Sequence, residues 1–312
     1  MKVCHVAHGV MPIPPTAWGA VEAVVADYNY WLNRLGHEVF VVNTPDLNDV
    51  ERQVNAIAPD VVHVHCERFF GLAERFSAPV RIICSHWPWL FEKASDREVL
   101  DLLAGSSYIC CLSDRTYRHL LRLGIPADRL FVTINGARSD LFRIDREPLH
   151  ADRSVCLAAV TERKRQFLIQ DIECIDFIGP KQSLAFDYSR PNYVGEWTRP
   201  QIYNDLTAYA NLVLLSASEV APLATCEALM AGLGVVVSEA AAGNLDRSKP
   251  FITIIPEERT TDVTYVRQKV IDNRRIAIRM RPSIREYAES AFDWKHIVGE
   301  YANRVSKILH AV

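Results

Sequence analysis

Short apolar runs alternate along this chain with longer stretches in which apolar residues recur at helical spacing. Runs that are rich in β-branched residues and apolar at nearly every position are typical of parallel strands covered on both faces. The stretches between them have the period of amphipathic helices, as in AVEAVVADYNYWLNRLGH, where we expect the helix to stop at Gly36. Alternating strands and helices predict an α/β fold built on doubly wound parallel sheets.

The alternation is interrupted once, by a polar segment around residues 135–152 with a turn signal at Asn135–Gly136 and a helix breaker at Pro148. Before it come the runs KVCHVAHG, EVFVVNT, VVHVHC, RIICSH, YICCLS and LFVTIN. After it come SVCLAAV, CIDFIG, NYVGEW, LVLLSAS, GVVVSEA and FITIIP. We therefore expect two Rossmann-like domains with a cleft between them, at 1–146 and 152–292. A last amphipathic helix, at about 295–312, is expected to pack back on the first domain.

Composition narrows the class of protein without naming a function. The 312 residues are 49% hydrophobic and 23% charged, which is ordinary for a soluble globular chain. A net charge of −3 argues against nucleic acid as a partner. The eight cysteines form no C-x-x-C pair, so we expect buried free thiols in a reducing cytoplasm.

No stretch predicts a membrane span or an export signal, because the opening MKVCHVAHG has the pattern of a strand. The basic segment Arg274–Arg285 is expected to be a solvated helix face. Contact of this segment with an anionic membrane surface stays open. We expect a cytoplasmic protein, with peripheral contact at the inner membrane surface as the alternative.

The segment SASEVAPLATCEALMAG, residues 216–232, places two carboxylates in small and apolar surroundings. Glu219 falls at the carboxyl end of a predicted strand, Pro222 suits the first turn of the next helix, and Glu227 lies further along that helix. Ligands of open α/β sheets bind at such strand ends, where helix amides attract phosphate. Carboxylates there can accept hydrogen bonds from vicinal sugar hydroxyls. The same spacing also fits one helix-capping acid and one solvent-facing acid.

Two common nucleotide-binding signatures are absent. After the first predicted strand, Gly9 and Gly19 lie ten positions apart with prolines between them, which is not the G-x-G-x-x-G of a dinucleotide-dependent dehydrogenase. The chain also has no G-x-x-x-x-G-K-[ST] phosphate loop.

Around the two acids the sequence resembles the retaining GT-B glycosyltransferases of family 4, whose hallmark is E-x7-E followed by E-A-(M/L)-A-x-G. Glu219, Glu227 and EALMAG match it. Further family landmarks follow one another along nearly the whole chain: PIPPTAWGAVEAVVADYNYWLNRLGHEVFVV, PDVVHVH, CSHWPW, CLSDRTYRHLLRLGIPADRLFVTINGARSDLF, IDFIGP, NYVGEWTRPQIYNDLTAYANLVLLSAS and FDWKHIVGEY. The resemblance implies two Rossmann-like domains facing a cleft. It also implies transfer of a sugar from a nucleotide-diphosphate donor to an acceptor hydroxyl, with retention of the anomeric configuration.

The resemblance also implies roles for single residues of the E-x7-E corner. Glu227 would hold the ribose hydroxyls of the nucleotide, and Glu219 would act at the donor sugar. The turn formed by Ala221, Pro222 and Leu223 would offer backbone amides to the sugar or diphosphate. Pro222 itself donates none, and the family often has glycine at this position.

Other donor-binding positions follow from the same resemblance. Gly19 would leave room for the diphosphate, and Gly179–Pro180 would border the nucleotide base. His86 would contact the donor sugar near the reacting carbon. The alternative for His86 is a histidine at the edge of the core beside Trp87 and Trp89.

The family supplies cations for the diphosphate, and Lys164 matches its lysine. The family's arginine is missing, since its position falls at Ala158 or Ala159, so Arg163 or Arg165 would stand in. No D-x-D motif is present, so we expect neither metal nor cofactor. His63 and His65 alternate on a strand and face one side, as a metal pair or as residues near a strand end.

Two alternatives to a glycosyltransferase stay open: a nucleotide-sugar epimerase of the same architecture, and a degenerate copy that binds nucleotide or acts as a scaffold without catalysis. The donor is expected to be a UDP-, GDP- or other nucleotide sugar. The acceptor is expected to be a glycan, a lipid or a small molecule.

Overall fold

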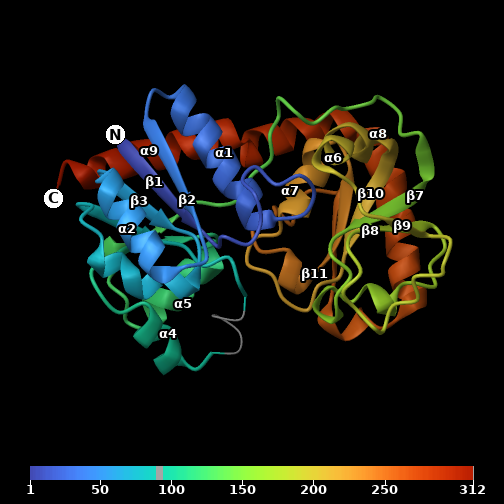
Figure 1. Cartoon of the computed structure of the whole chain (residues 1–312). Coiled ribbons are helices and arrows are strands. Elements are labelled where there is room, and N and C mark those ends of the chain that lie inside the picture. The colour runs from blue at the N-terminus through green and yellow to red at the C-terminus, as the bar shows by residue number, and fades with distance from the viewer. Residues whose placement is uncertain (89–93, 312) are drawn as a thin grey trace. The chain divides into compact units, whose positions relative to one another are not determined.

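The computed structural model describes residues 1–88 and 94–311, so Trp89, one of the two tryptophans near His86, lies outside the described residues. The chain forms two compact units (Figure 1). Unit 1 comprises residues 1–135 and 294–312, and unit 2 comprises residues 136–293. Residues 136–146 therefore pack with unit 2, whereas the sequence pattern had assigned them to the first domain.

Unit 1 is built on a parallel sheet whose strands lie in the order β2-β1-β3-β4-β5-β6. The strands are β1 (Lys2–Ala7), β2 (Glu38–Asn43), β3 (Val61–Val64), β4 (Val80–Ile83), β5 (Tyr108–Cys111) and β6 (Leu130–Val132). The helices are α1 (Ala20–Arg34), α2 (Leu47–Ile57), α4 (Asp96–Leu102), α5 (Asp114–Arg122) and α9 (Trp294–Leu309), with 3₁₀ segments η1 (Glu67–Arg75) and η2 (Ala127–Arg129).

Unit 2 is built on a second parallel sheet, in the order β12-β11-β10-β7-β8-β9. The strands are β7 (His150–Leu157), β8 (Ile175–Ile178), β9 (Tyr193–Gly195), β10 (Tyr209–Leu214), β11 (Gly234–Ser238) and β12 (Ile252–Ile255). The helices are α6 (Arg199–Asp205), α7 (Leu223–Met230) and α8 (Val263–Phe292). The 3₁₀ segments are η3 (Glu162–Lys164), η4 (Gln166–Leu168), η5 (Leu206–Ala208), η6 (Glu239–Ala241) and η7 (Glu257–Arg259).

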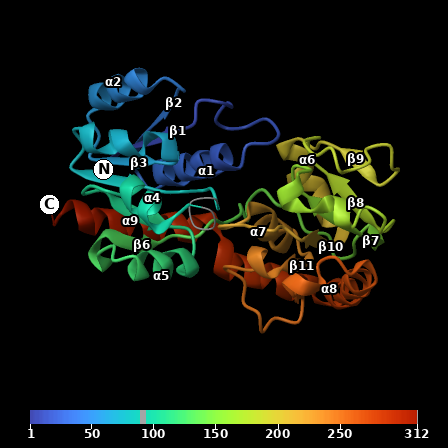
Figure 2. The same cartoon turned by 90° about the horizontal axis from the view of Figure 1, so that it is seen from below.

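The predicted α/β fold class is confirmed, and each apolar run named from the sequence overlaps one of these strands. The central strands are buried along their whole length, as in β10 and β11, because helices cover both faces of a doubly wound sheet. Helix α8 packs against β10 and β11 (Figure 2). The predicted cleft between the two sheets stays a prediction.

Helix α9 belongs to the core of unit 1, although it follows unit 2 in the sequence. It packs against α1 (Figure 1). Trp294 and Tyr301 of α9 are both 1% exposed, and their rings contact the ring of Tyr28 on α1. The core of unit 1 is therefore completed by a segment that lies far from the rest of it along the chain.

The basic segment Arg274–Arg285 is only in part the solvated face that the sequence predicted: Arg275 and Arg279 are exposed, but other arginines of the run are not. Arg281 is fully buried and donates to the carbonyl oxygens of Asp145, Thr207 and Tyr209, at 2.8, 2.7 and 2.9 Å. Arg285 donates to three further carbonyl oxygens of unit 2. A run of like charges does not by itself mark a surface, because guanidinium groups can donate to carbonyl oxygens in a core when each N–H has an acceptor.

All eight cysteines are free thiols, and all but the half-buried Cys174 are buried, which confirms the expectation of free thiols. Within residues 1–88 and 94–311, no helix combines the length and the apolar character needed to cross a bilayer.

Candidate functional site

The two loops that carry the predicted cations and the first glutamate leave neighbouring strands. Strand β7 leads into η3, and its neighbour β10 leads into the loop that ends at α7. In the sheet of unit 2, β8 and β9 follow β7 toward one edge, whereas β11 and β12 follow β10 toward the opposite edge. Such a reversal of strand order leaves a crevice at the carboxyl ends of the two strands, which is where open α/β sheets bind ligands.

Hydrogen bonds within the protein itself join these two loops. The backbone N–H of Ala217 donates to the carbonyl oxygen of Arg163 at 2.8 Å. The side chain of Arg163 in turn donates through Nη1 to the carbonyl oxygen of Ser218 at 2.7 Å. The backbone around Glu219 is therefore set by the segment that carries the cations.

Glu219 receives two cations on one oxygen. Its Oε1 accepts a hydrogen bond from Nζ of Lys164, and Nη1 of Arg163 lies 3.2 Å away. Burial alone would raise the pKa of Glu219, but the charges of Lys164 and Arg163 outweigh it and hold this pKa below its ordinary value. Two cations against one carboxylate leave a net positive charge, which suits an anionic ligand.

The structure distinguishes the two arginines that could replace the missing one. Arg163 lies beside Glu219, as described above. Arg165 has a left-handed backbone, with φ of 58°, and its Nη2 lies 2.6 Å from Oε1 of Glu257. Arg163 is therefore the arginine that the fold brings to Glu219, and Arg165 is directed to η7.

Glu227 lies in the second turn of α7 and is 5% exposed. Its Oε1 lies 2.7 Å from Nη2 of Arg199, whose guanidinium also stands 4.7 Å from the ring centre of Tyr203. Burial alone would lower the pKa of Arg199, but Glu227 and Tyr203 raise it overall. Sequence reasoning missed Arg199, because no spacing in the chain links the start of α6 to α7.

The turn before α7 differs slightly from the prediction. The helix begins at Leu223, so Pro222 is the residue before the first turn and not part of it. Its φ of −68° is compatible with either position. The carbonyl oxygen of Pro222 accepts a hydrogen bond from Oγ1 of Thr225 at 2.8 Å. Ala221 and Leu223 flank it, and helix first-turn amides such as that of Leu223 lack intrahelical acceptors.

Gly179 and Pro180 follow β8, next to the end of β7. A Cβ atom at Gly179 would stand 2.0 Å from the carbonyl oxygen of Ala158, so this close passage of two backbones requires glycine. The N–H of Val160 donates to the carbonyl oxygen of Pro180 at 2.9 Å. Gly179–Pro180 is thereby held against the segment that leads into η3.

Gly19 and His86 belong to unit 1. Gly19 precedes α1 with φ of 136°, and a Cβ atom there would stand 3.0 Å from Oε2 of Glu22 and 3.1 Å from Cβ of Pro15. The loop itself thus requires glycine, independently of any ligand. His86 follows β4 and is half-buried, and its Nε2 lies 3.1 Å from Nδ1 of His65.

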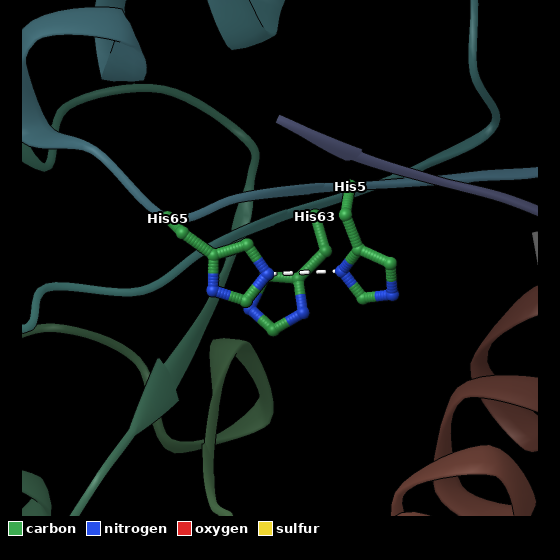
Figure 3. A group of neighbouring side chains, drawn as sticks. All are labelled: His5, His63 and His65. Atoms are coloured by element: carbon green, nitrogen blue, oxygen red, sulfur yellow. Dashed lines mark hydrogen bonds between the residues drawn. The ribbon is translucent and has the colours of Figure 1, made fainter. Parts of the chain in front are cut away.

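Unit 1 also contains two groups of side chains with the chemistry of transition-metal ligands. Among the described residues, His5, His63 and His65 form one group, and His63, Cys84 and Cys110 form the other. In each group the candidate ligand atoms lie within 4.8 Å of one another. His63 and His65 do face the same side, as their alternation predicted, with ring centres 4.0 Å apart (Figure 3). Both are fully buried, so they do not line an open strand end.

No protein-family model matches the chain, and no curated protein matches its sequence. Its structure does match solved structures over almost its whole length. HepE from Anabaena, in complex with UDP and glucose, gives a TM-score of 0.73 at 14% identity and covers 98% of this chain and 99% of its own.

Two further solved structures show the same likeness. AviGT4, a glycosyltransferase involved in avilamycin A biosynthesis, gives 0.71 at 17% identity and covers 100% of this chain and 98% of its own. Sucrose-phosphate synthase from Thermosynechococcus elongatus gives 0.78 at 13% identity and covers 99% of both chains. These likenesses show that the chain has the GT-B fold of glycosyltransferases.

Proposed function

We propose that this protein is a retaining glycosyltransferase, of the hexosyltransferase type, that moves a sugar from a nucleotide-diphosphate donor to an acceptor hydroxyl. One observation carries the proposal: Lys164 and Arg163 meet Glu219 at the point where the strand order of unit 2 reverses. A net positive, half-buried group at that point suits a diphosphate. The GT-B fold and the E-x7-E resemblance support the same assignment.

Each part of the donor has a partner in unit 2. Lys164 and Arg163 bind the diphosphate oxygens, assisted by the amides of the first turn of α7. Glu227 accepts hydrogen bonds from the ribose hydroxyls, with Arg199 holding one of its oxygens in place. Glu219 accepts hydrogen bonds from the sugar, while Gly179–Pro180 borders the base. By the family resemblance, His86 and Gly19 of unit 1 act at the donor sugar and diphosphate.

The proposed mechanism of transfer depends on where charge develops as the bond to the diphosphate breaks. The bond between the anomeric carbon and the diphosphate oxygen breaks, and the carbon passes through a state of oxocarbenium character. Lys164 and Arg163 stabilise the charge that collects on the departing diphosphate. The acceptor oxygen bonds to the anomeric carbon on the face that the diphosphate leaves, and its proton passes to the leaving phosphate oxygen. The configuration is therefore retained, and no protein base is needed.

We propose that the reaction needs no metal ion, since the side-chain cations supply the charge. Addition of EDTA is then expected to leave the rate of transfer unchanged. A loss of activity that Mg²⁺ or Mn²⁺ restores would contradict this part of the proposal.

The choice of first donor rests on the solved structures. HepE has been solved with UDP and with UDP-glucose. We therefore propose a UDP-sugar as the first donor to test, with GDP-sugars next. The acceptor is a glycan, a lipid or a small molecule, and we propose a cytoplasmic location with the inner membrane surface as the alternative.

The test measures donor consumption and product identity with and without acceptor. Lys164→Met and Glu219→Gln are expected to reduce transfer at least tenfold. Lys249→Met, which changes a half-buried lysine near Asp246 in the same unit, is the matched control and is expected to change little. Unchanged transfer in both site variants would reject the assignment.

The same measurement separates the two alternatives. A nucleotide-sugar epimerase would convert the donor to an isomer in the absence of any acceptor. A degenerate copy would bind the donor, as seen by calorimetry, without consuming it across a panel of acceptors.

A further inference from the structure

Three imidazole rings form a continuous hydrogen-bonded line through unit 1. Nδ1 of His5 lies 2.9 Å from Nε2 of His65, and Nδ1 of His65 lies 3.1 Å from Nε2 of His86. The sheet creates this line. His5 on β1 is in register with His63 on β3, His65 comes two residues later on the same face, and His86 follows the next strand, β4. Figure 3 shows His5 and His65 facing each other edge to edge.

The rings of this line are uncharged. Burial lowers the pKa of His5 to about 3. Burial, with a contribution from His8, lowers the pKa of His86 to about 3, and burial with the neighbouring rings holds the pKa of His65 well below its ordinary value. A neutral imidazole has one N–H donor and one bare acceptor nitrogen. All hydrogen bonds along the line must therefore point in the same direction, which allows only two arrangements of the protons.

The far end of the line selects between the two arrangements. Nε2 of His5 is buried and has no hydrogen-bond partner among residues 1–88 and 94–311. A buried N–H without an acceptor is rarer in proteins than a buried acceptor without a donor. Nε2 of His5 is therefore the bare nitrogen, and Nδ1–H of His5 donates to His65. Nδ1–H of His65 then donates to Nε2 of His86, which leaves the proton of His86 on Nδ1.

We propose that His65 and His5 are positioning residues, which hold His86 as the neutral imidazole with its proton on Nδ1. His86 then offers a fixed N–H donor to an oxygen of the substrate. That last step rests on the proposed function, in which His86 acts at the donor sugar, whereas the tautomer itself does not.

A metal ion held by His5, His63 and His65 fits the geometry less well. Metal ligation requires the in-plane lone pairs of the rings to converge on one point. The rings of His63 and His65 are inclined by only 32° with centres 4.0 Å apart, so the two rings lie largely face to face and do not turn their edges to a common point. The facing nitrogens of His5 and His65 already share a proton.

Nitrogen NMR of histidine-labelled protein, without substrate, tests the tautomer directly, because protonated and bare ring nitrogens resonate far apart. In the native protein, Nδ1 of His86 is expected to be protonated and Nε2 bare. His65→Leu is expected to leave His86 as a mixture of tautomers. His65→Asn, whose amide places an N–H near the former Nδ1, is expected to restore the single tautomer.

His63→Gln is the matched control, because His63 lies on the same strand and face but is bonded to Tyr301 and not to the line. It is expected to leave the tautomer of His86 unchanged. Should His65→Leu fail to fold, His5→Leu gives the same readout, since it removes the donor at the far end. A proton on Nε2 of His86 in the native protein overturns the proposal. Signals that shift when a chelator removes bound metal also overturn it.

Kinetics provides the second readout. His65→Leu is expected to lower kcat/KM for the donor about tenfold, the worth of one hydrogen bond, with recovery in His65→Asn. The results distinguish failure of the proposed glycosyltransferase function from failure of the proposed positioning role. The expected tautomer without transfer from any donor would reject the glycosyltransferase, whereas transfer with mixed tautomers in the native protein would reject the positioning role.

Discussion

The two units share one architecture, and each has a characteristic group of buried polar side chains. Unit 1 buries His5, His63 and His65, which are uncharged and bonded largely to one another or to Tyr301. Unit 2 buries charged groups, such as Arg281, fully enclosed by carbonyl oxygens, and Glu227, paired with Arg199. A neutral network and a set of compensated charges both satisfy buried polar atoms, but they respond differently to acid and to mutation.

Acid is expected to produce the largest difference in stability between the two units. The pKa values of His5, His63 and His65 lie below 6.5 in the folded protein, so below pH 6.5 the unfolded chain binds protons that the native state does not. Stability of unit 1 is then expected to fall as pH falls, by about 5 kcal/mol between pH 6.5 and 5 for three such groups. Glu219, with its lowered pKa, contributes to unit 2 above its ordinary value of 4.5 and loses this only at lower pH.

Chemical denaturation over a pH series, followed by signals of each unit, checks this order. His63→Gln is expected to reduce the pH dependence of unit 1 by about 1.4 kcal/mol per pH unit, the share of one histidine. Unfolding of both units together near pH 4, with none earlier, would contradict the comparison.

Removing the fully buried cation Arg281 of unit 2 should have the next largest effect. Arg281→Met leaves the carbonyl oxygens of Asp145, Thr207 and Tyr209 without this donor, and is expected to cost about 3–5 kcal/mol of unfolding free energy. Arg279→Met, at an exposed position on the same helix, is the control and is expected to stay within about 0.5 kcal/mol. Equal effects of the two variants would show that the buried guanidinium is not a structural element.

The diphosphate site gives a smaller effect, seen in binding. Lys164→Met is expected to weaken UDP binding by roughly 10- to 100-fold, because a hydrogen bond to a charged group contributes about 1.5–3 kcal/mol. Arg165→Met, in the same segment but paired with Glu257, is expected to change affinity less than about twofold. Calorimetry with UDP measures both, and the reverse order would assign the diphosphate to Arg165.

The ribose contact should give the smallest effect. If Glu227 accepts the ribose hydroxyls, the native protein is expected to prefer UDP over 2′-deoxy-UDP by about tenfold, the worth of one hydrogen bond. Glu227→Gln is expected to lose most of this preference while keeping the diphosphate contribution. A preference that survives the substitution would place the ribose elsewhere.

The sequence predicted the strands well because burial on both faces leaves a local signature: β10 and β11 are apolar at almost every position. It placed Glu219 at the carboxyl end of such a strand, whereas Lys164 was identified only through the family resemblance. It could not show that the loops of these two residues meet, since this depends on β7 and β10 being neighbours in the sheet.

The residues that the sequence missed all act through partners distant along the chain. Arg199 pairs with Glu227, and Arg281 with carbonyl oxygens from several elements. Pattern alone treats both as surface cations, because charge usually marks solvent. His5 was likewise unremarkable until the register of β1 with β3 placed it beside His63 and His65.

The return of α9 to unit 1 has a consequence for biosynthesis. Residues 136–293 form unit 2 as one uninterrupted stretch, so this unit can complete its structure as soon as that stretch has left the ribosome. Unit 1 must wait, because Tyr301 of α9 reaches His63 only after 238 further residues have been synthesised. The half of the molecule that is translated first is thus the half that matures last, and until then the core residues that α9 covers stay exposed.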